Sequence, residues 1–218
     1  MLDYAAARRN MVDSQLKPNR VLEPRVVGAM AAVPREAFVP EGIGGLAYID
    51  EDLSIGGGRY LMEPMVFGRL LQACRVDAGD LVLDVGCGTG YATAVLARLA
   101  ATVVGLEDDP NLRARATATL AKLGVDNAVV VEGAHARGNP GNGPYDVIFL
   151  GGGVAAVPQS LREQLRPTGG RLAAVILGKR IGRATLIERH GDLFSERTLF
   201  DASVPLLPGF AAERGFVF

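Results

Sequence analysis

The sequence predicts an α/β protein built on a mostly parallel β-sheet, and three features support this prediction. From Leu81 onward, short runs of Val, Ile and Leu alternate with glycine turns and helical segments. These runs are apolar throughout, which is typical of parallel strands covered on both faces. Near the end of the chain, two strand-like runs flank His190-Gly191-Asp192, which predicts an antiparallel hairpin.

Composition is that of an ordinary globular protein. The chain has 218 residues, 49 % of them hydrophobic and 22 % charged, so it can bury a full core. With 23 Lys and Arg against 24 Asp and Glu and no long basic stripe, we expect no nucleic-acid partner. No signal-peptide pattern is found, and no apolar run approaches the ~20 residues of a membrane span. We therefore expect a cytoplasmic protein with no membrane partner.

We expect one domain, residues 1–218, in which 1–75 form a helical cap and a loop. One helix is predicted over 3–16, and a second begins at Pro24 and ends before Pro34. The stretch 41–64 has no clear period, and loops of this length inside a compact domain are usually functional. A third helix is predicted over about 65–75.

Residues 76–218 are predicted to form the sheet. The clearest helix covers 111–123 and is closed by Gly124. The expected strands are the five apolar runs before the terminal hairpin: 81–85, 102–107, 128–132, 146–150 and 171–177.

A glycine-rich loop between a strand and a helix is the decisive motif. The dinucleotide fingerprint G-x-G-x-x-G, counted from Gly86, would need a glycine at position 91, where the chain has tyrosine. Glycines instead occur at Gly86, Gly88 and Gly90, and Asp84 precedes them. This closer spacing resembles the S-adenosylmethionine loop of class I methyltransferases, whose ligand has no pyrophosphate to bind. Asp84 would supply negative charge near the ligand's ammonium group, and Cys87 a small side chain within the loop.

Glu107 supports the same interpretation. It ends the next strand, 19 residues after Gly88 (107 − 88), where a carboxylate can accept hydrogen bonds from both ribose hydroxyls. Alone, the loop could be a tight turn and Glu107 a solvated strand end. Together they predict S-adenosylmethionine binding. The alternation of strands and helices from Leu81 and the terminal hairpin predict the class I methyltransferase fold: a seven-stranded, Rossmann-like sheet, mostly parallel with an antiparallel last strand, helices on both faces and an N-terminal helical cap.

The residues at the end of the fourth predicted strand indicate which kind of chemical group accepts the methyl group. Methyltransferases that act on DNA adenine or on glutamine carry an N/D-P-P-Y motif there, whereas this chain continues as Gly151-Gly152-Gly153. An amine or amide acceptor is therefore disfavoured. A hydroxyl, carboxylate or carbon acceptor remains open.

The whole chain resembles the protein-L-isoaspartate O-methyltransferase family. The resemblance covers an N-terminal signature, the entry to the substrate loop and the later strands, namely 11–12, 15–16, 25–26, 29–30, 33–40, 47–48, 53–56, 144–148, 157–158, 164–165 and 169–172. It implies methylation of isoaspartyl carboxylates in damaged proteins or peptides, with S-adenosylmethionine as cofactor and S-adenosylhomocysteine as product. No metal is implied.

The chain departs from the family at several positions. In the substrate loop, Arg59 stands where the family has glutamine and Met62 where it has its catalytic serine. Ala134 replaces the aspartate that binds the adenine amino group, and the proline after the fifth strand is missing from 174–176. The resemblance leaves Arg59, Tyr60 and Met62 as candidate catalytic residues. The candidate cofactor-binding residues are Asp84, Gly86, Cys87, Gly88, Gly90, Glu107, Asp108 and Ala134.

Residues 56–64, rich in glycine, are predicted to form a flexible flap over the cofactor's methyl end. Arg59 there could clamp the acceptor carboxylate, or it could face solvent while Met62 fills a cavity. His135 and His190 are expected to have no catalytic role, because no ligand set accompanies either in the sequence. Two alternative functions stay open: methylation of a small-molecule acceptor, and a non-catalytic binding module.

Overall fold

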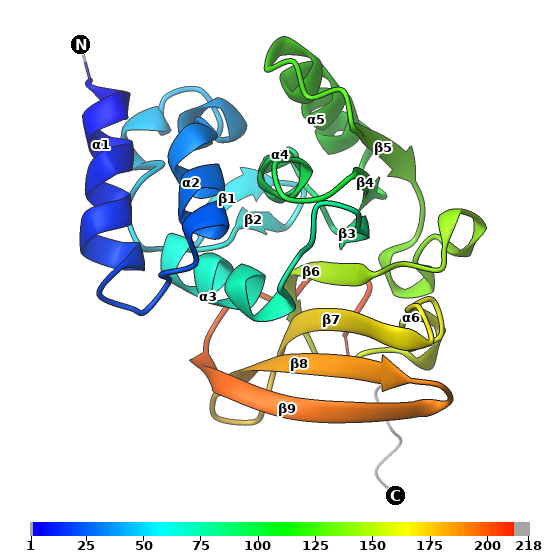
Figure 1. Ribbon diagram of the computed structural model, residues 1–218. Coiled ribbons are helices and arrows are strands. Elements are labelled where there is room, and N and C mark those ends of the chain that lie inside the picture. The colour runs from blue at the N-terminus through cyan, green and yellow to red at the C-terminus, as the bar shows by residue number, and fades with distance from the viewer. Residues whose placement is uncertain (1, 212–218) are drawn as a thin grey trace, which may run out of the picture.

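The computed structural model describes residues 2–211, and its centre is a seven-stranded sheet with the order β5-β4-β3-β6-β7-β8-β9 (Figure 1). Strands β3 to β7 are parallel, β8 is antiparallel to β7, and β9 is antiparallel to β8. The predicted sheet with an antiparallel last strand and a terminal hairpin is confirmed. The strands are β3 Leu81–Val85, β4 Thr102–Glu107, β5 Ala128–Glu132, β6 Val147–Val154, β7 Thr168–Ile176, β8 Gly182–His190 and β9 Leu193–Ala202.

Side chains alternate between two cores because successive residues of a strand face opposite sides. Val82 of β3 belongs to the core under the large helices, whereas its neighbour Leu83 belongs to the core on the other face. The helices and helical turns are α1 Tyr4–Met11, a π-helix Val12–Leu16, α2 Pro24–Ala32, α3 Pro64–Cys74, α4 Tyr91–Ala97, α5 Pro110–Lys122, α6 Gln159–Arg162, and 3₁₀ turns Arg35–Phe38, Gly44–Leu46, His135–Arg137 and Pro140–Asn142.

The two faces of the sheet are covered unequally. Leu70 of α3, Leu96 of α4 and Leu120 of α5 lie in the core on one face. On the other face the described helical cover is short: Leu161 of α6 packs there, together with Leu207 from the chain after β9. Helices thus lie on both faces as predicted, and the large ones share one side.

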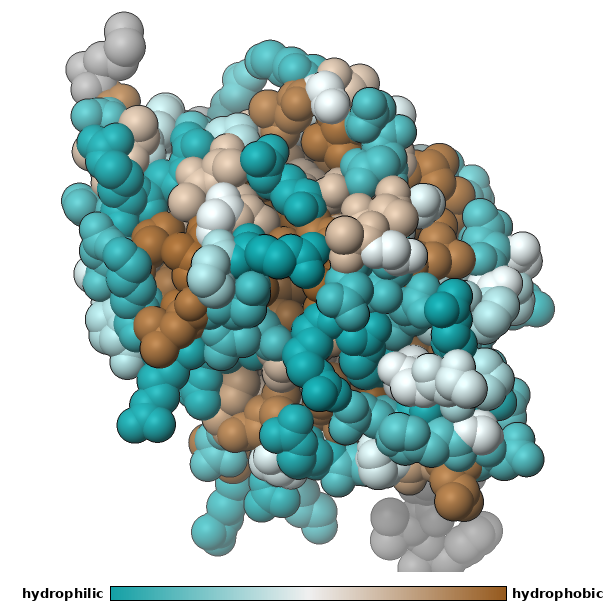
Figure 2. All heavy atoms as spheres, viewed as in Figure 1, coloured by the Kyte–Doolittle hydropathy of each residue, from teal (hydrophilic) through white to brown (hydrophobic). Residues whose placement is uncertain are grey.

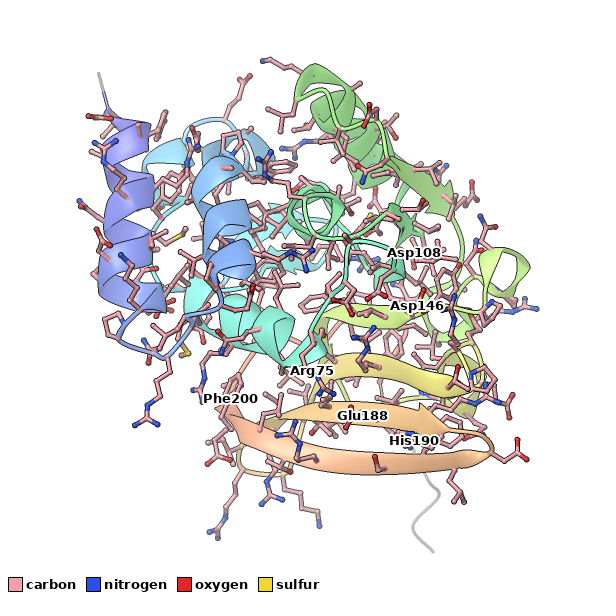
Figure 3. The ribbon with its side chains drawn as sticks, viewed as in Figure 1. Arg75, Asp108, Asp146, Glu188, His190 and Phe200 are labelled. Atoms are coloured by element: carbon pink, nitrogen blue, oxygen red, sulfur yellow. The ribbon has the colours of Figure 1, made fainter. Side chains whose placement is uncertain are left out.

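The N-terminal helices extend the first core outward. Met11 of α1 and Met30 of α2 are buried in the same apolar cluster as Leu70 and Val82. The boundaries follow local signals: the Asp3 carboxylate accepts from the Ala6 N–H at the start of α1, and Pro24 opens α2. At the C-terminal end of α3, Arg75 forms an ion pair with Glu188 of β8 at 2.6 Å (Figure 3).

Arg35 joins this N-terminal part to the chain around the predicted loop. It is fully buried, its guanidinium donates to the carbonyls of Ala47 (2.6 Å) and Met62 (2.7 Å), and it lies 4.9 Å from the centre of the Tyr91 ring. A buried guanidinium with carbonyl partners is a cross-link between segments that are distant in sequence.

We expect the Arg35→Met variant to lose about 2–3 kcal/mol of unfolding free energy. Two buried carbonyls would lose their donor, at about 1–3 kcal/mol each, and relief from burying a charge would offset part of this. Urea unfolding followed by circular dichroism measures the difference. Arg180→Met, at an exposed position on the β7–β8 loop, is the control. Equal stability of the two variants would contradict this role of Arg35.

The predicted loop over residues 41–64 contains a β-hairpin that its irregular sequence pattern does not predict. Leu53–Gly56 (β1) and Arg59–Leu61 (β2) form a two-stranded antiparallel hairpin. Its turn is made by Gly56, Gly57 and Gly58, all with positive φ (95°, 58° and 69°), a conformation that glycine adopts without a Cβ penalty. The expectation of a loop without regular structure is wrong here, because strands of three or four residues are too short to show a period.

The described surface shows no large apolar face in the view of Figure 2, where hydrophobic residues occur in small groups separated by hydrophilic ones. Exposed apolar side chains lie on separate elements, such as Leu22, Val129 and Leu193. Within residues 2–211, no helix has both the length and the apolar character that crossing a membrane requires.

Candidate active site

The glycine loop lies where the sequence places it, between β3 and α4 at the carboxyl end of the parallel strands. Gly86, Gly88 and Gly90 have φ values of 73°, 56° and 94°, so each needs the conformational freedom of glycine. The Gly86 N–H donates to the Leu106 carbonyl at 2.9 Å, which anchors the loop to β4. Ligands of open α/β sheets bind in this crevice.

Glu107 joins the loop to the end of β4. It is fully buried; its Oε2 accepts from the Gly88 N–H at 2.9 Å and its Oε1 from the Asp109 N–H at 3.0 Å. Burial acts to raise the pKa of Glu107, but hydrogen bonds and positive charge from His135, the Asp109 N–H and Arg59 outweigh it and hold the pKa well below its usual range. Glu107 is therefore ionised at neutral pH.

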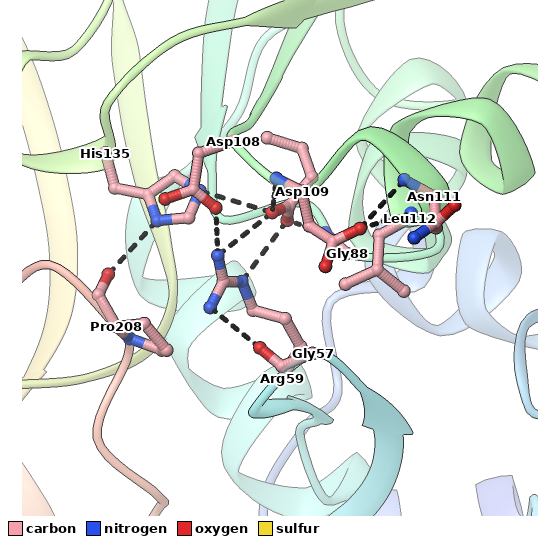
Figure 4. Close-up of polar contacts among 10 residues, drawn as sticks. Gly57, Arg59, Gly88, Asp108, Asp109, Asn111, Leu112, His135 and Pro208 are labelled. Atoms are coloured by element: carbon pink, nitrogen blue, oxygen red, sulfur yellow. Dashed lines mark hydrogen bonds and ion pairs between the residues drawn. The ribbon is translucent and has the colours of Figure 1, made fainter.

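Arg59 of the hairpin is the main partner of Glu107, and Figure 4 shows its guanidinium beside Asp108. Its Nη2 lies 3.0 Å from Glu107 Oε1, its Nε lies 3.4 Å from Glu107 Oε2, and Nη2 also contacts Asp108 Oδ1. Only 4 % of the Arg59 side chain is exposed. The interpretation of Arg59 as a solvent-facing loop residue is therefore wrong: the hairpin carries it into the crevice, where two carboxylates neutralise it.

His135 also lies in this cluster, although no set of carboxylates accompanies it at ligand spacing in the sequence. Its side chain is fully buried, with Nδ1 3.2 Å from the Pro208 carbonyl and Nε2 3.5 Å from Glu107 Oε1 and 3.7 Å from Asp108 Oδ1. Strands β4 and β5 end side by side, which brings residues 28 positions apart together. That His135 has no catalytic role stays a prediction. One signal was available: position 135 follows β5 at the same sheet edge as Glu107.

The carboxylates and His135 could offer three ligand atoms within 4.8 Å of one another. In the structure, the Arg59 guanidinium lies between the two carboxylates and supplies the positive charge that a cation would bring. The absence of a metal stays a prediction.

Asp84 points away from the crevice. Its Oδ2 accepts from the Thr93 hydroxyl of α4 at 2.6 Å, and its buried Oδ1 has no hydrogen-bond partner among the described residues. Burial raises the pKa of Asp84 to about 7, despite the Thr93 hydrogen bond. The carboxyl group is thus poised between its neutral and charged forms at neutral pH.

The space over the loop is small. A cavity of about 30 Å³ is bordered by Tyr60 and Met62 of the hairpin segment, by Cys87 of the loop and by Gly151 within β6. Met62 is buried at 6 % exposure, which fits its interpretation as a cavity-filling residue, whereas Tyr60 is 40 % exposed.

Two apolar side chains occupy the cradle itself. A Cβ at Gly88 would lie 2.6 Å from Ile55 Cδ1 of β1, and a Cβ at Gly86 would lie 2.6 Å from Leu207 Cδ1. The sequence did not single out Ile55 or Leu207, because a lone aliphatic residue carries no functional signal. Of the remaining candidates, Asp108 is exposed beside Arg59, with 44 % of its side chain accessible, and Ala134 is exposed in the turn before His135.

The residues of this crevice fit S-adenosylmethionine: a loop of three glycines with positive φ, and a buried, ionised carboxylate at the end of the neighbouring strand. Together with the seven-stranded sheet, these features define a class I methyltransferase. The chain belongs to the protein-L-isoaspartate(D-aspartate) O-methyltransferase family, whose model matches residues 7–204.

Relatives and solved structures agree with this assignment. The chain is 43 % identical to protein-L-isoaspartate O-methyltransferase 1 of Rhodopseudomonas palustris (strain HaA2) over 169 residues, which are 78 % of this chain and 69 % of that protein. It is 38 % identical to the protein-L-isoaspartate O-methyltransferase of Roseiflexus sp. (strain RS-1) over 216 residues, 98 % of each. A solved protein-L-isoaspartate O-methyltransferase matches with a TM-score of 0.82 and 27 % identity, covering 93 % of this chain and 67 % of that one.

Proposed function

We propose that this methyltransferase transfers a methyl group from S-adenosylmethionine to the carboxylate of isoaspartyl residues in proteins or peptides. The observation that carries the cofactor assignment is the buried, ionised Glu107, which accepts from the Gly88 N–H of the glycine loop at 2.9 Å. The family membership and its relatives' names support the acceptor.

The residues we assign to the cofactor divide by role. Glu107 would accept the ribose hydroxyls, while Gly86, Gly88 and Gly90 let the backbone pass close to the methionine tail. Cys87 borders the small cavity over the glycine loop. Asp84 would lie beneath the glycine loop without contacting the cofactor directly, since its carboxyl accepts from the Thr93 hydroxyl. Asp108 and Ala134, beside Glu107 and before His135, are assigned to the adenosine end.

When bound, the cofactor supplies a methyl group already activated by its sulfonium. A carboxylate acceptor is ionised near pH 7 and needs no base, and transfer leaves a methyl ester and a neutral thioether. The chain's task is therefore to align the acceptor and to exclude water. The apolar wall of Met62, Phe67 and Phe149 beside Tyr60 suits that task.

The replacement of the family's serine by Met62 is compatible with this chemistry. A serine at such a site positions the acceptor by one hydrogen bond, worth about 1–3 kcal/mol, rather than by taking a proton. Met62 lies instead in the apolar core, and its carbonyl accepts from Arg35. Acceptor positioning would then depend on other side chains of the hairpin.

We also propose that residues 1–218 act as one domain in the cytoplasm. One apolar core runs from Met11 and Met30 of the helical cap through Leu70 of α3 to Val82 of the sheet, which supports joint folding of 1–75 with 76–218.

Methyl transfer to an isoaspartyl peptide, measured with radiolabelled S-adenosylmethionine beside a normal aspartyl peptide of the same sequence, tests the proposed function. We expect transfer to the isoaspartyl peptide and little to the aspartyl one. Calorimetry with S-adenosylhomocysteine and with NAD is the parallel measurement. Cofactor binding without transfer to either peptide would favour a small-molecule acceptor or a binding module, and tight binding of NAD alone would overturn the cofactor assignment.

A further inference from the structure

The carboxylate of Glu107 has its hydrogen-bonding capacity filled. Oε1 accepts from Arg59 Nη2 and the Asp109 N–H, both at 3.0 Å, and Oε2 accepts from the Gly88 N–H at 2.9 Å and Arg59 Nε at 3.4 Å. An ionised carboxylate offers about four lone-pair sites. Two of the four partners are backbone amides, that of Gly88 in the glycine loop and that of Asp109 after β4, so a ribose can bind Glu107 only by replacing Arg59.

The space over the loop leads to the same conclusion. The cavity there measures about 30 Å³, whereas sites for ligands of this size usually measure about 300 Å³ or more. Ile55, which lies against Gly88, belongs to the same hairpin as Arg59. The hairpin turns on three glycines with positive φ. Movement of this one hairpin would remove both the Ile55 side chain from Gly88 and the Arg59 guanidinium from Glu107.

The acceptor carboxylate, in turn, would be stabilised by a cation, because no serine stands at position 62 to position it. A second cavity, about 10 Å³, lies on the other side of Tyr60 and Met62 and is lined by Asp52, Arg59 and Gly151 among others. Within the described part of the chain, Arg59 is the one cationic side chain that lines either of the two cavities. An acceptor carboxylate entering beside Asp52 would meet like charge unless the Arg59 guanidinium turned toward it.

We propose that Arg59 is a positioning residue that exchanges partners: it holds the hairpin on Glu107, and it passes to the acceptor carboxylate when the ribose takes Glu107. This inference rests on the proposed function. It makes acceptor binding conditional on cofactor binding, because the cation needed by the acceptor is released only when the cofactor occupies Glu107.

The Arg59→Gln substitution should then have two opposite effects. S-adenosylhomocysteine should bind at least about tenfold more tightly by calorimetry, since no buried ion pair has to be broken. The KM for the isoaspartyl peptide at saturating S-adenosylmethionine should rise at least about tenfold, since the carboxylate loses its cation. A residue with a purely structural role would move both quantities in the unfavourable direction.

Two further variants serve as controls. Arg59→Lys keeps the charge but not the forked guanidinium, so its KM should lie between those of the wild type and Arg59→Gln. Arg180→Gln removes one exposed positive charge from the β7–β8 loop and should change neither quantity. Circular dichroism melts establish that each variant is folded.

Equal or weaker S-adenosylhomocysteine binding by Arg59→Gln would overturn the exchange, and so would an unchanged KM. Failure of both the wild type and Arg59→Gln to bind S-adenosylhomocysteine would instead overturn the proposed function. The calorimetric comparison of these two proteins therefore separates the two failures.

Discussion

The Glu107→Ala variant is expected to lose about 3–5 kcal/mol of unfolding free energy and to bind S-adenosylhomocysteine about 2–3 kcal/mol more weakly. The first effect arises because the guanidinium of Arg59, 4 % exposed, would lose its buried carboxylate and keep only the exposed carboxylate of Asp108 and the Gly57 carbonyl. Removing the buried partner of a buried charge is costly. The second arises because the ribose would lose a charged acceptor. Urea unfolding and calorimetry measure the two effects separately.

Glu132 offers a matched control for this substitution. It ends β5 directly opposite Glu107 in the sheet, but its side chain is 74 % exposed and pairs with Arg113 at the surface. Glu132→Ala should therefore cost no more than about 1 kcal/mol. Adding Arg59→Gln to Glu107→Ala should recover part of the lost stability, because the stranded charge is then removed. Equal costs for the two alanine variants would refute the buried ion pair.

The second large effect concerns pH and Asp84. In the folded protein, burial raises the pKa of this carboxyl to about 7, whereas in the unfolded chain it is about 3.9. Between these values the folded state holds a proton that the unfolded state lacks, so the stability contributed by Asp84 is present below about pH 4 and is lost as the pH rises through 7. At about 1.4 kcal/mol for each unit, the loss amounts to about 4 kcal/mol.

Asp84→Asn should abolish this dependence. The amide does not titrate, and its oxygen can still accept from the Thr93 hydroxyl. The stability difference between the wild type and the variant, measured by urea unfolding from pH 5 to pH 8, should shift against the wild type up to about pH 7 and level off above it. Glu107 does not mask the trend, because its lowered pKa keeps it ionised in both states over this range. Asp192→Asn in the exposed β8–β9 turn is the control, and a difference that stays flat with pH would show that Asp84 is ionised when folded.

The sequence by itself determined the elements that depend on near neighbours. The apolar runs predicted β3, β4 and β5 within a residue or two, and the His190-Gly191-Asp192 turn predicted the terminal hairpin. The spacing of Gly86, Gly88 and Gly90 predicted a cradle after β3, because only glycine enters positive φ freely. Each of these features is encoded within a single segment of the chain, the longest being the hairpin from Gly182 to Ala202.

Only the tertiary structure decided how the site is assembled. Arg59 contacts Glu107 across 48 positions, and His135 approaches it across 28, so no local pattern announces either contact. The hairpin that carries Arg59 has strands of four and three residues, too short to show a period. A side chain's partners depend on which strand ends meet at the sheet edge, and its charge state depends on the burial that results. Both are properties of the packed chain rather than of any segment.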